Sequence, residues 1–216
     1  LKLDKSQAVA SIGQIELMNL FKKTFNKSKI NLSQILLTLE DTEKRRRAIN
    51  AKRTFENLFK KKFNSKKINL SQILLTLEDT EQRRRAINAK RTFENLFKLK
   101  FVPIVNENDS IATSEIKYGD NDRLASRVAQ ISGADCLILL SDVNGFYSKN
   151  PKIDKNAKLI KEIKNIDDTI ERIATKSVGE HGTGGMKTKI DAAKICQLAG
   201  CHMAISNGLI NRPIKH

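Results

Sequence analysis

The sequence predicts an α/β fold in which helices cover both faces of a mainly parallel sheet. Downstream of residue 101, short apolar stretches alternate with stretches of helical periodicity, and this alternation is typical of parallel sheets. The chain has 216 residues, of which 39% are hydrophobic, so it can build a substantial core. In such folds, ligands bind at the carboxyl ends of the strands.

The first half of the chain contains a tandem repeat. An amphipathic helix is expected in LKLDKSQAVASIGQIELMNLF. The segment INLSQILLTLEDTEKRRRAINAKRTFENLF starts at Ile30 and returns from Ile68 with one change. Residues 19–63 and 57–101 are identical at 40 of 45 positions, which indicates a recent duplication rather than an ancient solenoid.

Each copy predicts one strand followed by one helix. NLSQILLTL is a strand candidate, and Asp41 or Asp79 is expected to cap the helix after it. We place the two units at about 26–63 and 64–101. We expect the second copy to fill the native position, because it adjoins the next strand, and either the first copy or a hybrid helix–strand segment to be displaced outward. The apolar positions of the first copy's helix are Ala48, Ile49, Phe55, Leu58 and Phe59.

The second half predicts strands and helices in alternation. FVPIVNEND is a buried strand, DNDRLASRVAQISGA a helix, and CLILLSDV a second buried strand that ends in the turn NGFYS. KLIKEI is expected to be an exposed strand and DDTIERIATK a short helix. GTGGMKTKIDAAKICQLAGC runs from a glycine-rich loop into a helix that stops at Gly200, and HMAISNG is the last strand.

The net charge of +16 is typical of nucleic-acid binders, but its location favours a solvated helix surface. Residues 19–101 contain 22 Lys and Arg against 8 Asp and Glu, so most of the charge comes from one basic segment written twice. The KRRR and QRRR runs each open a helix that also carries Glu43 or Glu81. No aromatic residues are interleaved for base stacking. A nucleic-acid-binding module is the less favoured interpretation.

The cysteines and histidines suggest neither a disulfide nor a metal site. The cysteines lie in apolar or small-residue settings without a paired CxxC spacing, so we expect reduced core residues of a cytoplasmic protein. The histidines have no ligand-like spacing. No apolar run approaches the ~18 residues that span a membrane, and no signal peptide is recognisable. These residues are Cys136, Cys196, Cys201, His181, His202 and His216.

GTGGMKTK places three glycines and two lysines at a helix start, where free backbone N–H groups and the helix dipole favour phosphate. It is not a Walker A loop, because Met186 rather than glycine precedes Lys187. The segment is either an anion-binding loop or a flexible surface loop. Its glycines and its second lysine are Gly182, Gly184, Gly185 and Lys189.

Carboxylates and amides follow the predicted strands. Residues 106–122 contain five carboxylates and three asparagines, suited to a small polar substrate, although a surface loop can have this composition. Ser141 and Asp142 finish the next strand and are either site residues or ordinary turn residues. A phosphate loop, lysines and carboxylates without a nucleophile elbow suit phosphoryl transfer, in which positioning and charge stabilisation do most of the catalysis.

Four ordered motifs resemble the glutamate 5-kinases of the amino-acid kinase family: VPIVNEND, IKYGDNDRLASRVAQISGAD, LLSDVNGFY and GTGGMKTKIDAA. QAVASIGQIELM and QILLTLEDTE with INAKRTFENLF extend the resemblance upstream, so it covers essentially the whole chain apart from 38 extra residues. The resemblance implies a three-layer α/β/α sandwich. It also implies ATP- and Mg²⁺-dependent phosphorylation of the side-chain carboxylate of L-glutamate, the committed step of proline synthesis, by a cytoplasmic homo-oligomer.

The resemblance also implies roles for individual residues. Asp109 and Asn121 would hold the amino-acid end of glutamate. Ser141 and Asp142 would lie against the nucleotide. Lys189 would stabilise charge on the transferred phosphoryl group, and Asp122 would orient the catalytic lysines. Magnesium would be held by phosphate oxygens, so no protein ligand is expected. The loop around the ATP phosphates would comprise Thr183, Gly184, Gly185, Met186, Lys187, Thr188 and Lys189.

Two family segments are missing from this sequence: a first strand with a Lys-Leu-Gly-Ser-like motif and a Ser-Gly-Ala turn, which would precede Leu1. The last strands of the sheet would follow His216. We therefore expect a partial kinase domain over residues 1–216 with little or no activity by itself. The alternative is a catalytically inactive nucleotide-binding remnant of such a kinase.

Overall fold

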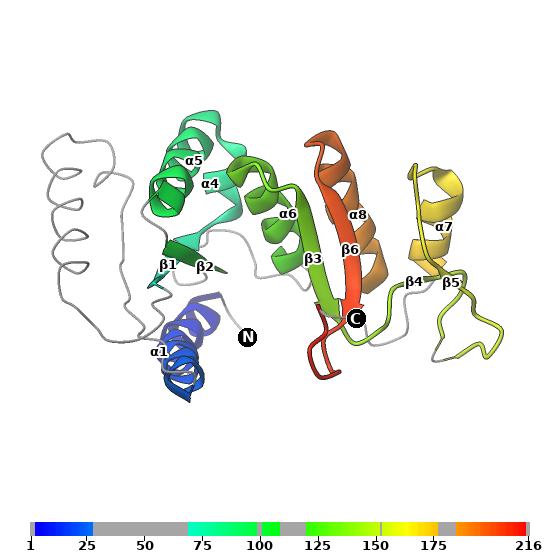
Figure 1. Ribbon diagram of the computed structural model, residues 1–216, viewed down its shortest axis with the longest axis horizontal. Coiled ribbons are helices and arrows are strands. Elements are labelled where there is room, and N and C mark those ends of the chain that lie inside the picture. The colour runs from blue at the N-terminus through cyan, green and yellow to red at the C-terminus, as the bar shows by residue number, and fades with distance from the viewer. Residues whose placement is uncertain are drawn as a thin grey trace, which may run out of the picture. The chain divides into compact units, whose positions relative to one another are not determined.

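The computed structural model describes residues 3–27, 69–98, 101–108, 120–151, 153–176 and 185–214. The chain divides into two compact units, residues 1–116 and 117–216, which are considered separately (Figure 1). The first copy of the repeat falls almost entirely outside the described residues, and so do its helix positions and Asp41. Among the described helices, none combines the length and the apolar character needed to cross a membrane.

The first unit begins with helix α1 (Leu3–Lys27), which confirms the expected N-terminal helix. Met18 is buried. Val9, Ile12 and Ile15 are more than 60% exposed, so much of the helix's apolar surface is not covered by the described residues. At its C-terminal end, Phe21 and Phe25 stack with their ring centroids 6.2 Å apart.

The second copy of the repeat forms strand β1 (Asn69–Leu75) and helices α4 (Leu77–Glu81) and α5 (Arg83–Lys98). β1 pairs in parallel with β2 (Phe101–Glu107) in continuous register from Asn69 opposite Phe101 to Leu75 opposite Glu107. The second copy therefore supplies the neighbour of the strand that ends in NEND.

The helix cap of this copy differs from the sequence prediction. Thr76, not Asp79, is the N-cap: its hydroxyl accepts a hydrogen bond from the Asp79 backbone N–H, and the Asp79 carboxylate accepts one from the Thr76 backbone N–H. This reciprocal capping box satisfies two donors, whereas a capping aspartate alone would satisfy one. Asp79 also accepts a hydrogen bond from Arg85 at 3.2 Å.

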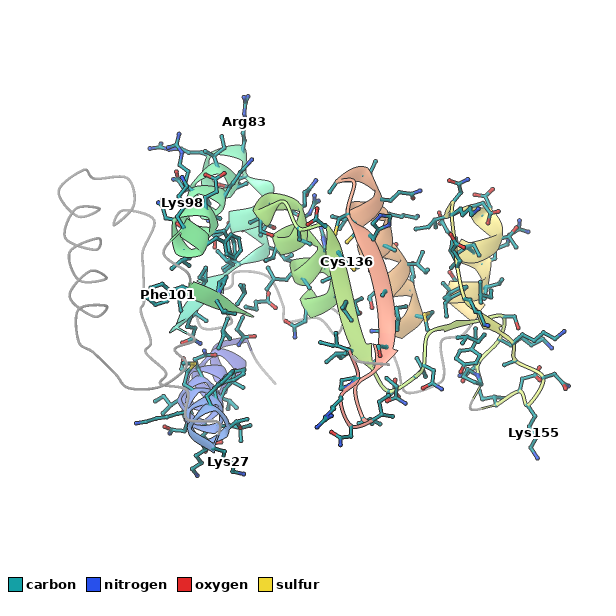
Figure 2. The ribbon with its side chains drawn as sticks, in the orientation of Figure 1. Lys27, Arg83, Lys98, Phe101, Cys136 and Lys155 are labelled. Carbon is teal, nitrogen blue, oxygen red and sulfur yellow. The ribbon has the colours of Figure 1, made fainter. Side chains whose placement is uncertain are left out.

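Helix α5 buries one face and exposes its charges. Phe93 and Leu96 are each only 1% exposed, whereas Phe97 is 48% exposed. The side chains of Arg83 and Lys98, at the two ends of the helix, project away from the ribbon (Figure 2). This arrangement agrees with a solvated basic helix face.

In the second unit, helices α6 (Asp120–Ser132) and α8 (Gly185–Leu198) lie against the parallel strands β3 (Cys136–Ser141) and β6 (His202–Asn207). Figure 1 shows the two helices side by side behind the strand pair. α8 ends before Gly200, whose φ of 71° is the left-handed conformation favoured at a helix stop. The α/β class predicted from the sequence is confirmed.

A smaller part of this unit contains the antiparallel pair β4 (Phe146–Tyr147) and β5 (Leu159–Ile160) and helix α7 (Asp168–Lys176). The strand expected in KLIKEI is therefore only two residues long. Phe146, Ala174 and Ile190 form a buried cluster that joins β4, α7 and α8. An ion pair of 2.6 Å between Lys194 and Glu171 also connects α8 to α7.

Three burial predictions were wrong. Strand β2 was expected to be buried, yet Phe101 is its one buried residue and Val102 is 49% exposed. Strand β3 was expected to be buried, yet Ile138 and Leu140 are 39% and 52% exposed, because α6 and α8 pack against the opposite face of the strand. Cys136 was expected in the core but is exposed at the first position of β3. Cys196 and Cys201 are buried as expected, and all three cysteines are free thiols.

Candidate functional site

The strongest candidate site lies where the first turns of α6 and α8 meet. Asp122 is in the first turn of α6, and Lys189 is one turn into α8. The Lys189 ammonium donates a hydrogen bond of 2.8 Å to Oδ2 of Asp122. The Lys189 side chain is 13% exposed and that of Asp122 20%, so the pair is mostly shielded from water and its geometry is fixed.

Thr188 is the third member of this contact. Its hydroxyl lies 3.1 Å from Oδ2 of Asp122 and also 3.1 Å from the carbonyl oxygen of Gly185. One carboxylate oxygen thus lies within hydrogen-bond distance of both an ammonium and a hydroxyl group. Charge-assisted hydrogen bonds of this kind are stronger than neutral ones, which favours a single orientation of Lys189.

The two lysines of GTGGMKTK have different surroundings. Lys187 is exposed, whereas Lys189 is held by Asp122. The first turn of α8 carries backbone N–H groups without an intrahelical acceptor, and the positive end of the helix dipole lies there. Gly185 opens the helix. This end of α8 therefore combines a fixed cation, an exposed cation and backbone donors, which suits a phosphate chain.

Met186, predicted within the phosphate loop, packs instead against the cluster formed by Phe146, Ala174 and Ile190. Its side chain is therefore used to attach the start of α8 to α7 and β4. Only the backbone of Met186 is left to face a ligand. The sequence signal for this role was a single apolar residue in an otherwise polar glycine-rich motif.

The carboxyl ends of β3 and β6 form a second group of site residues. Ser141 and Asp142 finish β3, with the Ser141 hydroxyl 3.3 Å from Oδ1 of Asp142. The Gly208 backbone N–H donates to the Ser141 carbonyl at 2.8 Å, which extends the pairing one residue beyond the strands. Main-chain hydrogen bonds therefore hold this edge together, and the Asp142 side chain is exposed.

Asn144, Asn207 and Gly208 also belong to this edge. Asn144 opens the turn NGFYS that the sequence predicted here, whereas Asn207 and Gly208 were not predicted as site residues. The Asn207 amide donates a hydrogen bond of 3.0 Å to the side-chain oxygen of Asn144. The sequence did contain a signal: one Asn-Gly dipeptide lies shortly after β3 and the other starts at the last residue of β6.

The residues predicted to bind the substrate are only partly described. Asn121 is exposed in the first turn of α6. In the first unit, the Asn106 amide of NEND donates a 3.0 Å hydrogen bond to Gln14 of α1, and the Asn108 N–H continues the pairing with β1 by donating to the Leu75 carbonyl at 2.9 Å. Asp109, Thr183 and Gly184 lie outside the described residues.

Within the described part of the chain, no group of three or more His, Cys, Asp or Glu side chains could hold a metal ion. The Asp122 carboxylate faces Lys189 and Thr188. In phosphoryl-transfer sites, magnesium is usually bound by waters, one or two carboxylates and the phosphate oxygens of the substrate.

Comparison with known proteins points to one family. A model of the amino acid kinase family matches residues 49–207. The chain is 70% identical over 215 residues to the glutamate 5-kinase of Pelagibacter ubique, covering all of this chain and 48% of that protein. It is 44% identical to the glutamate 5-kinase of Nitrobacter hamburgensis and 42% identical to that of Rhizobium rhizogenes, again along its whole length. The chain spans about half the length of these relatives.

Proposed function

The chain belongs to the amino acid kinase family, and on that premise we propose that it is part of a glutamate 5-kinase. The reaction is the ATP-dependent phosphorylation of the side-chain carboxylate of L-glutamate. An oxygen of that carboxylate attacks the γ-phosphorus, the bond to the β-phosphate oxygen breaks, and ADP leaves with glutamyl 5-phosphate as the other product. The product serves proline synthesis. Three relatives of 42% to 70% identity carry this enzyme's name.

The contact between Lys189 and Asp122 is the observation that carries the proposal. A phosphoryl transfer of this kind needs little covalent chemistry from the protein and depends on a correctly placed positive charge. Lys189 supplies that charge, and Asp122 fixes its ammonium at one point of the site. The first turn of α8 and the exposed Lys187 bind the rest of the phosphate chain.

In this proposal, the other residues predicted for the site take part in the same reaction. Ser141 and Asp142 bind the nucleotide at the end of β3, and Asp109 and Asn121 hold the amino-acid end of glutamate. Magnesium, bound through phosphate oxygens, offsets the negative charge of the nucleotide. The homo-oligomeric state and cytoplasmic location of the full-length enzyme belong to the same proposal and rest on the family resemblance.

Calorimetric titration of the chain with Mg²⁺-ATP tests the nucleotide site. We expect saturable binding that Lys189→Met strongly weakens. Lys194→Met is the matched control, because Lys194 lies on the same helix but pairs with Glu171, away from the proposed phosphate site. Equal affinities for the two variants would contradict the role of Lys189.

Glutamate-dependent ADP release then separates the kinase from an inactive remnant. Turnover that requires both L-glutamate and Lys189 supports the kinase. Saturable nucleotide binding without turnover supports the alternative, a nucleotide-binding remnant. Turnover that is independent of glutamate contradicts the proposed substrate.

A further inference from the structure

We infer that Asn144 and Asn207 are positioning residues, which hold the nucleotide-binding end of β3 in place by a hydrogen bond between their side chains. The inference rests on the proposed nucleotide site. β3 and β6 are parallel neighbours whose last paired residues are Ser141 and Asn207. One Asn-Gly dipeptide starts three residues after the end of β3 and the other starts at the last residue of β6. The two asparagines meet although 63 positions separate them in the sequence.

The hydrogen bonds fix the orientation of the Asn207 amide. Its Oδ1 accepts the backbone N–H of Leu209 at 2.9 Å, so its Nδ2 is the atom left to donate. That donor reaches Oδ1 of Asn144 at 3.0 Å. Asn207 therefore closes its own turn with one end of the amide and holds the neighbouring turn with the other.

Gly208 allows the end of β6 to lie close to the end of β3. A Cβ atom at position 208 would lie 3.0 Å from Cβ of Leu140 on the adjacent strand, a distance that requires the neighbour to shift. The Gly208 N–H also donates to the Ser141 carbonyl at 2.8 Å. The backbone on both sides of Asp142 is thus attached to the end of β6, at Ser141 by the main chain and at Asn144 by the side chain.

This attachment matters for binding because Asp142 is exposed and lies between the two anchored positions. A residue that meets a nucleotide from a fixed backbone loses less conformational freedom on binding than one on a free loop. Loss of the link is therefore expected to weaken nucleotide binding about threefold to tenfold.

Two substitutions at position 144 separate the link from electrostatics. Asn144→Ala removes the partner of the Asn207 amide, so the link is lost. Asn144→Asp keeps an acceptor for that amide, so the link survives although a negative charge is added at the same edge. We expect Asn144→Ala to weaken Mg²⁺-ATP binding about threefold to tenfold more than Asn144→Asp does.

Asn207→Ser provides a second, uncharged loss of the link, because its hydroxyl can still accept the Leu209 N–H but is too short to reach Asn144. We expect it to weaken binding about as much as Asn144→Ala does, and the double variant Asn144→Ala with Asn207→Ser to be no weaker than Asn144→Ala alone, because the same bond is removed. Additive losses would mean that the two side chains act separately and would overturn the inference.

Amide hydrogen exchange of the nucleotide-free chain provides a readout that does not depend on binding. Exchange at residues 143–145 should be faster in Asn207→Ser and Asn144→Ala and unchanged in Asn144→Asp. Faster exchange with unaltered Mg²⁺-ATP affinity would overturn the positioning role and leave the proposed function intact. If the parent chain bound no Mg²⁺-ATP, the proposed function would fail, and the link would be shown to position no nucleotide.

Discussion

The Nζ atom of Lys189 lies 2.8 Å from Oδ2 of Asp122. The two residues are 67 positions apart in the sequence, and their contact connects the N-terminal parts of α8 and α6. The two side chains are only 13% and 20% exposed. A contact with this geometry fixes a positive charge at the start of α8, where the backbone also favours anions.

Removing the Asp122 charge should therefore affect both stability and binding. We expect Asp122→Asn to lower the free energy of unfolding by about 1.5–3 kcal/mol, the range for hydrogen bonds to charged groups, and to weaken Mg²⁺-ATP binding because Lys189 is no longer held. Urea denaturation and calorimetry measure the two effects.

Asp154→Asn is the control for this substitution, because Asp154 also pairs with a lysine, Lys149, at 2.7 Å, but on the surface. Surface ion pairs contribute little to stability, so its urea midpoint and nucleotide affinity should stay close to those of the parent chain. An effect as large as that of Asp122→Asn would show that burial does not distinguish the two pairs.

Met186 should contribute to stability through packing. We expect Met186→Ala to lower the free energy of unfolding by about 1–3 kcal/mol, less than for a fully buried methionine, because the side chain is only partly buried against Phe146, Ala174 and Ile190. Met186→Leu keeps most of the side-chain volume and should lower the free energy of unfolding by less than Met186→Ala does. If both variants unfold at the same urea concentration as the parent chain, the packing role is wrong.

Cys196 should make stability fall at high pH. Burial raises the pKa of its thiol from 9.0 to about 12, so the unfolded chain loses this proton at lower pH than the folded chain does. The stability that comes from keeping the Cys196 thiol protonated in the folded chain is complete below pH 9. It is lost as the pH rises toward 12, and the free energy of unfolding then falls by up to about 1.4 kcal/mol per pH unit.

Urea titrations from pH 8 to pH 11 check this prediction against Cys196→Ala. The variant removes the titrating group, so its stability should decline less steeply with pH, even though the smaller side chain lowers stability at every pH. Other groups titrate in both proteins and cancel in the comparison. Parallel curves would show that the Cys196 thiol does not contribute.

The two copies of the repeat should respond differently to the same substitution. Leu75 is buried in β1 and pairs with β2, so Leu75→Asp should lower the free energy of unfolding by more than about 3 kcal/mol. Leu37 is the matching residue of the first copy, and we expect Leu37→Asp to change stability by less than about 0.5 kcal/mol. Similar losses would show that both strands are part of the core.

Deleting one repeat provides a second test of this prediction. Removal of residues 30–67 joins α1 to the second copy, and thermal unfolding should then occur at a higher temperature, because 38 fewer residues need to be accommodated. A lower unfolding temperature would mean that the first copy stabilises the fold.

The sequence predicted the elements of the second half well, because their period and their turn residues are local signals. The helix of DNDRLASRVAQIS and the strands of CLILLS and HMAISN were all expected and are confirmed. Burial was less predictable: CLILLS reads as a buried strand, yet Ile138 and Leu140 are exposed. An apolar run specifies a strand but not which of its faces another element covers.

For the candidate site, too, some features follow from the local sequence and others only from the tertiary structure. By itself, the sequence determined that this protein has a glycine-rich turn with lysines at a helix start, and polar residues after apolar strands, because backbone donors and side-chain charges are properties of the local chain. The tertiary structure decided which of these residues meet. It pairs Lys189 rather than Lys187 with Asp122, packs Met186 against a buried cluster, and joins Asn144 to Asn207. These contacts depend on how α6, α7, α8 and the parallel strands pack together, which no local pattern specifies.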